Sequence, residues 1–323
     1  MQVVRDAQPD EERWRQLRRA LWITIAGNLL LAIGKGVVAH LSGSVALYAD
    51  AANSASDVAY SLLMALGLWL SMRPPDLSHP QGHSRFEPLA GLVVASAMTL
   101  AGYEAGKAAV LRLMEGGTAV AVGWPTAALL VSAAVKAAMY ISISRTASLT
   151  GSSTLGAAAK DNLADVLTSA AAFLGTLGSQ FIHPLADPIA GLFVALWIFR
   201  SALGVWRENL RYLSGGGAST ELQLEIASAA RTVEGVLRVH QVITEHVGPD
   251  LIADLHINVD GALTLVAAHA ISDEVRERVE SLDGIDRAYV HLEPCEGMSK
   301  VSRLPGDPAE LEDGNFQDRQ GEL

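Results

Sequence analysis

The sequence of 323 residues has little charge and almost no cysteine. Asp, Glu, Lys and Arg make up 18% of its residues, whereas a soluble domain carries about 25%. The charged residues gather in the first 19 positions and after Arg200, so a membrane part joined to a soluble part is expected. The single cysteine, Cys295, excludes an intramolecular disulfide framework and any CxxC zinc or redox site.

The chain also lacks an excess of basic residues, because its formal net charge is −11. Proteins that bind nucleic acid usually present a basic face, so no nucleic-acid partner is expected. Residues 298–323 are acidic and have no apolar periodicity, which predicts a disordered, solvated tail. The polar, charged N-terminus does not have the pattern of a cleaved secretory signal.

Six stretches are apolar enough and long enough to cross a bilayer, which takes roughly 20 helical residues. They run over 19–40, 44–71, 86–112, 125–145, 155–181 and 188–207. Arginines flank one set of connecting loops, whereas the 40–44 turn and the 178–187 loop carry no Lys or Arg. The positive-inside rule then predicts a multi-pass protein of the inner or plasma membrane, with both termini in the cytoplasm.

After Gly215 the pattern becomes that of a small soluble domain. It predicts helices over 221–232 and 265–282, and strands over 238–246, 252–259 and 287–293. The order α-β-β-α-β predicts a small α/β, ferredoxin-like sheet covered on one side by helices. The expected organisation is a cytoplasmic segment over 1–18, a six-helix membrane domain over 19–208, a cytoplasmic domain over 209–297, and the tail.

Polar residues inside the second and fifth spans are the main candidates for a functional site, because ionisable groups are costly in a bilayer. Asn53 and Asp57 lie four residues apart in the second span, so they share one face of a helix. Asp161 and Asp165 have the same spacing in the fifth span. If the two helices face each other, they present three carboxylates and one amide oxygen to one point.

A divalent cation would allow three carboxylates to lie together, since bare charges would repel one another and protonate. These donors are all hard oxygens, a set that suits Mn, Mg or Ca better than Zn or Cu. Alternatively, these residues cap or break helices, or pair with lysines. Asp50 either supports the site or lies at the interface. The other charged residues of the spans are interpreted as internal ion pairs or interfacial anchors: Lys35, Glu104, Lys107 and Lys136.

Several motifs, taken in order, resemble the cation diffusion facilitator family from the first span to Glu296. In the membrane part these are GKGVVAHLSGSVALYADAANSASD, HPQGHSRFEPLAG, AAAKDNLADVLTS and ADPIAGLFVALWI. In the soluble part they are GVLRVHQVITEHVGP, LHINV and YVHLEPC. The resemblance implies a homodimer that exchanges protons for a divalent metal ion, with no enzymatic activity and no cofactor. It also implies that the cytoplasmic domain serves metal sensing and dimerisation.

The resemblance further implies that the transported ion is bound at the positions of Asn53, Asp57, Asp161 and Asp165. Family members that carry zinc usually have His or Asp at the first position and His at the third. The set found here is similar to that of bacterial manganese exporters in the family. Export of Mn²⁺ is therefore expected, with Zn²⁺, Fe²⁺, Co²⁺ or Cd²⁺ as alternatives.

Two further groups of residues match metal positions of the family. The first, in the loop between the second and third spans, consists of Asp76, His79 and His83. The second, in the soluble domain, consists of His240, His256, His269, His291 and Glu293. The alternatives are a proline-rich turn for the first group and a solvated sheet face for the second. His246 matches no family position and is expected at the surface.

Two readings outside metal export remain open. Paired Asp residues in separate spans are also found in intramembrane aspartyl proteases, where two carboxylates serve as acid and base. The turn-spaced pairs and the lack of a GxGD motif argue against this reading. The second is a membrane protein that senses metal without transporting it.

Overall fold

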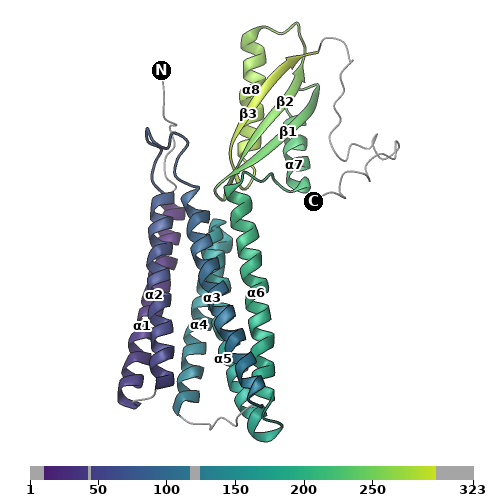
Figure 1. Ribbon diagram of the computed structural model, residues 1–323. Helices are drawn as coiled ribbons and strands as arrows, with labels where there is room; N and C mark the ends of the chain where they lie inside the picture. The colour runs from purple at the N-terminus through teal and green to yellow at the C-terminus, as the bar shows by residue number, and fades with distance from the viewer. Residues whose placement is uncertain (1–10, 43–44, 117–123, 296–323) are drawn as a thin grey trace, which may run out of the picture. The chain divides into compact units, whose positions relative to one another are not determined.

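A computed structural model describes residues 11–42, 45–116 and 124–295, and the chain divides into two units between Leu213 and Ser214. The predicted acidic tail and the first ten residues lie outside the described part, as do the side chains of Asp50 and Asn53. The first unit contains six long helices (Figure 1): α1 (Glu11–Ser42), α2 (Val45–Ser71), α3 (Phe86–Met114), α4 (Trp124–Thr150), α5 (Ser153–Phe181) and α6 (Ala186–Leu213).

The six long helices predicted from the sequence are confirmed. Three stretches, Glu11–Val38, α3 and α6, are long and apolar enough to cross a membrane by length and composition alone. Helices α2, α4 and α5 have similar lengths of 27, 27 and 29 residues, and they carry the polar residues of the candidate site. Helix α1 begins at Glu11, before its apolar span, because the charged segment that precedes the span is rich in good helix formers.

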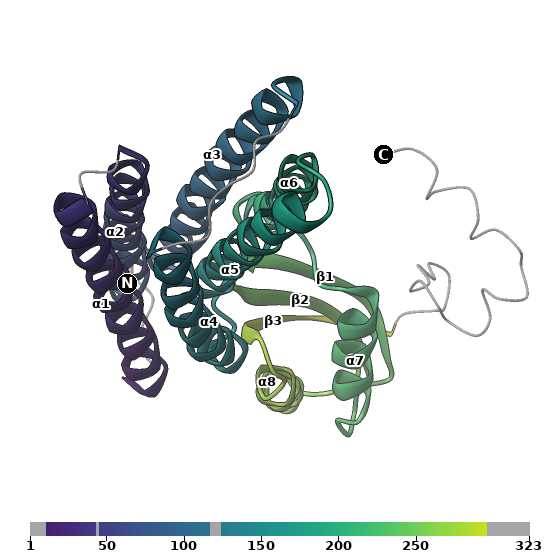
Figure 2. The same cartoon turned by 90° about the horizontal axis from the view of Figure 1, so that it is seen from below.

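The helices of the membrane unit pack mainly as pairs. Helix α1 packs on α2, α3 on α6, and α4 on α5. The view along the helices shows α1 beside α2 and α4 beside α5 (Figure 2). Buried apolar side chains, among them Leu17, Met98 and Ile143, fill the space between the helices. Large apolar side chains such as Trp22 and Phe193 point outward, as expected for a surface that faces lipid rather than water.

A polar contact fixes α3 against α6 and α5. The side chain of Asn209 in α6 is fully buried, and its Nδ2 donates to the Val205 carbonyl at 2.9 Å. Its Oδ1 accepts from the Ser153 hydroxyl of α5 at 3.1 Å. Gly91 of α3 leaves room for this amide, since a Cβ there would lie 2.3 Å from Asn209 Oδ1. Small residues commonly permit this kind of close helix approach in membranes.

The second unit begins with helix α7 (Thr220–Arg231) and continues as β1 (Arg238–Val247), β2 (Asp250–Val259), α8 (Leu265–Glu280) and β3 (Ile285–Pro294). Strand β2 lies in the middle of the sheet, antiparallel to β1 and parallel to β3. Alternate residues of β2 are buried, including Leu255, Ile257 and Val259 as predicted. Ser219 and Thr264 cap the two helices through side-chain oxygens. The αββαβ prediction is confirmed.

We expect Gly91→Ala to destabilise the protein by about 1–3 kcal/mol, because the added methyl group must displace a buried, hydrogen-bonded amide. Gly204→Ala is the matched control, since a Cβ at this exposed position of α6 meets nothing within 4 Å. Chemical denaturation of both variants in detergent measures the difference. Equal stability of the two variants would contradict the close approach of Gly91 to Asn209.

Candidate metal centres

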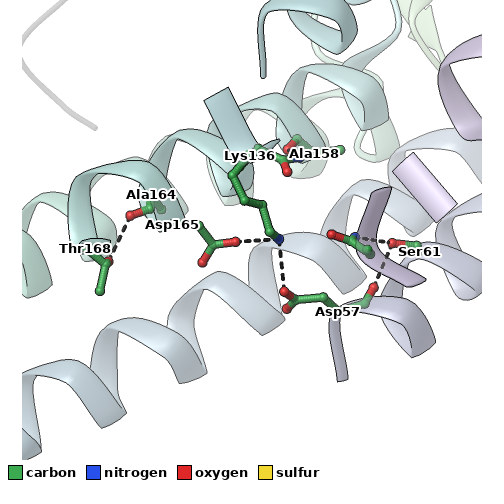
Figure 3. Close-up of polar contacts among 9 residues, drawn as sticks. Asp57, Ser61, Lys136, Ala158, Ala164, Asp165 and Thr168 are labelled. Carbon is green, nitrogen blue, oxygen red and sulfur yellow. Dashed lines mark hydrogen bonds and ion pairs between the residues drawn. The ribbon is translucent and has the colours of Figure 1, made fainter. Parts of the chain in front are cut away.

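Two carboxylates from different helices converge on one lysine inside the membrane unit. Lys136 Nζ, from α4, lies 2.9 Å from Asp57 Oδ2 of α2 and 2.6 Å from Asp165 Oδ2 of α5 (Figure 3). The contact with Asp57 has hydrogen-bond geometry. Only 4% of the Lys136 side chain is exposed, against 17% for Asp57 and 31% for Asp165. The structure therefore brings together the carboxylates that the sequence placed on separate spans.

Asp161 belongs to the same electrostatic cluster. It lies one turn before Asp165 in α5, and its charge acts on Asp165, Lys136 and Asp57. On the other helix, the Asp57 backbone is held by a chain of two hydrogen bonds. Ser61 Oγ donates to the Asp57 carbonyl at 2.7 Å, and Asn28 Nδ2 of α1 donates to Ser61 Oγ at 2.8 Å.

The part played by Lys136 was foreseen from the sequence only as an alternative to metal binding. The sequence contains the i, i+4 pairs, but nothing in it links α4 to α2 and α5. The backbone of Asn53 lies one turn before Asp57 in α2, while its side chain lies outside the described residues, as does that of Asp50. Asp57, Asp161, Asp165 and Lys136 therefore form one group of charges contributed by α2, α4 and α5.

The loop between α2 and α3 brings Asp76, His79 and His83 together. Asp76 Oδ2 lies 3.4 Å from His83 Nε2, and Asp76 Oδ1 lies 3.5 Å from His79 Nδ1. The backbone N–H groups of His79 and Ser78 donate to Asp76 Oδ1 and hold the pKa of this carboxyl below its usual value. In a tetrahedral zinc site with nitrogen ligands, two ligand atoms lie about 3.3 Å apart. The distances between the Asp76 oxygens and the histidine nitrogens are close to this value.

A second cluster lies on the polar face of the cytoplasmic sheet. Glu293 of β3 lies 3.4 Å from His240 Nε2 of β1 and 3.3 Å from His256 Nδ1 of β2. His291 is at its edge, with Nε2 3.9 Å from the same carboxylate. The hydrogen bond from His256, with the charges of the imidazoles, lowers the pKa of Glu293. Glu293 therefore remains an anion at pH values where a free glutamate would protonate.

A β-bulge determines which histidine of β1 joins this cluster. The pairing of β1 with β2 shifts between Val239 and Gln241, so His240 and Gln241 both point away from the core. The shift changes the alternation of the rest of the strand and buries His246, which is 8% exposed. The expectation that His246 lies at the surface is therefore wrong. A prediction from strict alternation of buried and exposed residues along β1 fails here, because it does not allow for the extra residue of the bulge.

His269 is not part of the cluster within this chain. It lies on α8, its side chain is 72% exposed, and its Nε2 is 3.5 Å from Asp273 Oδ2 one turn later. Among the described residues, the groups that bring three His, Cys, Asp or Glu ligand atoms within 4.8 Å of one another are the loop cluster and the sheet cluster. Both contain imidazole. The group formed by Asp57, Asp161, Asp165 and Lys136, called the membrane cluster below, offers carboxylate oxygens and an ammonium.

Comparison with known proteins identifies matches over both units. The family model of the cation efflux transmembrane domain matches residues 21–214, and that of the cation efflux protein cytoplasmic domain matches residues 218–295. An uncharacterized transporter of Methanocaldococcus jannaschii is 32% identical over 279 residues, which cover 86% of this chain and 99% of the relative. The manganese efflux system protein MneS of Bacillus subtilis is 28% identical over 88% of this chain and 99% of its own length. Magnetosome protein MamM of Paramagnetospirillum magneticum is 31% identical over 81% of this chain and 85% of its own length.

We expect Glu293→Gln to weaken the binding of Zn²⁺ by the cytoplasmic domain about 10–100-fold, because the variant loses the anion that faces two imidazoles. His269→Ala is the matched control and should bind as the wild type does, since His269 lies apart from the cluster. Equilibrium dialysis of the full chain, with the loop cluster removed by Asp76→Ala, measures both effects. If His269→Ala loses as much affinity as Glu293→Gln, the assignment of the cluster to His240, His256 and Glu293 is wrong.

Proposed function

The chain belongs to the cation efflux (cation diffusion facilitator) family, and we propose that the ion it exports from the cytoplasm is Mn²⁺, in exchange for protons. Membership makes it a multi-pass membrane transporter of divalent cations, not an enzyme, with a cytoplasmic C-terminal domain. The proposed transport site consists of Asn53, Asp57, Asp161 and Asp165.

One observation carries the site assignment. Carboxylate oxygens of Asp57 and Asp165, from two helices, lie within 2.9 Å of a single buried nitrogen atom, Lys136 Nζ. A point that holds one cation between two carboxylates is also suited to hold another. The third carboxylate, Asp161, acts on the same point through its charge. Intramembrane carboxylates are costly, and such clusters mark ion pathways in membrane proteins.

The choice of manganese rests on donor chemistry. Carboxylate and amide oxygens suit Mn²⁺, whereas imidazole and thiolate favour Zn²⁺. In the described part of the chain, the clusters with imidazole are formed by residues of the loop after α2 and of the cytoplasmic domain. The relative from Bacillus subtilis is a manganese efflux system protein, which supports the same ion. Zn²⁺, Fe²⁺ and Co²⁺ are the competing substrates.

The proposed cycle follows from the charge of the site. Mn²⁺ reaches the ionised carboxylates from the cytoplasm, the helices reorient, and protonation of Asp57, Asp161 or Asp165 on the other side releases the ion. Metal affinity falls on protonation because only the ionised carboxylates bind strongly. Asn53 adds a neutral oxygen and takes up no proton.

The assembly and orientation complete the proposal. The cytoplasmic domain matches a family domain named for dimerisation, so we propose a homodimer. The imidazole clusters of the loop and the sheet bind cytoplasmic metal and regulate transport. The N-terminus lies on the same side as the C-terminal domain, because arginines flank the loops on that side, and the membrane is the inner or plasma membrane.

Asp161→Ala should reduce Mn²⁺-driven proton movement on the order of 100-fold without loss of folded protein, because it removes one of three anionic ligands. Purified wild type and variant are placed in liposomes that contain a pH dye, and Mn, Zn, Fe, Co and Cd are offered in turn. Proton movement with Zn but not Mn would overturn the choice of ion. Wild-type rates in the variant would overturn the site, and no movement with any metal would favour the sensor.

Asn53→His should shift the preference of the transporter from Mn²⁺ toward Zn²⁺ by about tenfold, because imidazole is a better donor for zinc than an amide oxygen. The ratio of the two rates in the same liposomes measures the shift. Ser148→His is the control, since Ser148 is exposed on α4 and its hydroxyl donates to the Ser144 carbonyl of the same helix. An unchanged ratio in Asn53→His would show that the donor at this position does not set selectivity.

A further inference from the structure

Lys136 is a buried cation, and the proposed export of metal assigns it no role. Its ammonium group is almost fully enclosed, and it bridges α2 and α5 from a third helix, α4. A buried charge is costly unless charged partners surround it. Lys136 has such partners in Asp57 and Asp165, and Asp161 acts on it as a third negative charge. The pairing is therefore built into the packing of three helices.

The oxygens that hold Lys136 are also those proposed to bind the transported ion. A divalent ion at Asp57 and Asp165 would lie a few ångströms from an ammonium group that remained in its place. Like charges repel strongly at this separation when little water screens them. The ammonium and the metal therefore cannot both keep full contact with the two carboxylates.

We propose that Lys136 is a tethered cation that competes with the transported metal for Asp57 and Asp165, and so sets the affinity of the site and its preference for divalent over monovalent ions. The inference rests on the proposed function, namely that these carboxylates bind the exported ion. Lys136 acts through the carboxylates and is a positioning residue. It moves aside when the metal binds and returns when the metal leaves.

Two consequences follow from the charges. A divalent ion brings twice the charge of the ammonium to the same carboxylates, so it is attracted to them more strongly. A tethered competitor also has a high effective concentration at the site. A dissolved monovalent cation offers no more charge than the ammonium and cannot displace it, whereas a divalent ion can. The competition also lowers the affinity of the site for the metal. Lower affinity favours transport, because the ion must dissociate on the other side of the membrane.

A second lysine near the site does not have this geometry. Lys160, next to Asp161 in the chain, pairs with Glu208 of α6 at 3.1 Å and is 42% exposed. Lys35 of α1 acts on Asp57 through its charge. Lys160 is therefore a suitable control, because its removal changes the net charge near the cluster without removing a contact to Asp57 or Asp165.

The test measures Mn²⁺ binding to the full-length protein in detergent by equilibrium dialysis, with and without 0.5 M KCl, which is on the order of the concentrations that screen surface charges. Every chain, wild type included, carries Asp76→Ala and Glu293→Gln, which remove the loop and sheet clusters. Lys136→Gln should bind Mn²⁺ about tenfold more tightly than the wild type, because a competing unit charge is gone. Without the tethered ammonium, K⁺ can occupy the site, so 0.5 M KCl should lower the Mn²⁺ affinity of Lys136→Gln more than that of Lys160→Gln.

Transport in liposomes gives an independent readout. We expect both KM and kcat for Mn²⁺ to fall in Lys136→Gln, because a tightly held ion is released slowly. Lys136→Arg keeps the charge and should bind Mn²⁺ no more tightly than the wild type. If Lys136→Gln does not fold, tighter binding by Lys136→Arg overturns the proposal, and wild-type or weaker binding supports it.

The outcomes separate this inference from the proposed function. Unchanged Mn²⁺ affinity in Lys136→Gln, or equal tightening in Lys136→Gln and Lys160→Gln, overturns the role of Lys136. If Asp161→Ala loses Mn²⁺ binding in the same assay, the proposed transport site is supported, whether or not Lys136→Gln changes the affinity. If Asp161→Ala binds Mn²⁺ as the wild type does, the proposed site itself is wrong.

Discussion

The ion pairs of Lys136 with Asp57 and Asp165 are the interactions on which the membrane unit depends. Carboxylates in a region of low dielectric must be neutralised by a proton, a metal or another residue. Here the compensating charge comes from α4, so the relative placement of three helices is coupled to the charge at one point. A change of that charge is therefore also a change in helix packing, which is what transport by alternating access requires.

The surroundings of the cluster limit how the helices can respond. Asn28 and Ser61 fix the backbone of Asp57 through hydrogen bonds between α1 and α2, so this pair behaves as one element. The Gly91–Asn209 contact fixes α3 against α6. Lys136 and its two carboxylates lie between these better-packed parts. Interlocked apolar surfaces transmit strain, whereas Lys136 joins α4 to α2 and α5 through ion pairs.

The sequence predicted what depends on local periodicity and missed what depends on pairing. Spacing of four residues placed Asp161 and Asp165 on one face of α5, and alternation placed Ile257 on the buried face of β2, because both follow from the geometry of a single element. The pairing of Asp57 with Lys136 of α4 was expected only as an alternative to metal binding, since no spacing rule connects separate helices. The bulge at His240 was missed for a similar reason: an extra residue in a strand is defined only by its neighbour in the sheet.

The three candidate centres differ in how they tolerate the lack of a metal. In the cytoplasmic sheet, Glu293 is 41% exposed, and in the loop Asp76 is 54% exposed, so water can solvate both carboxylates. Their histidines can also be neutral, and neither cluster needs a built-in cation. Asp57 and Asp165 are less exposed and have no neutral histidine partner among the contacts described for them. A carboxylate cluster inside the membrane therefore needs a compensating cation or a proton, and here Lys136 supplies the cation.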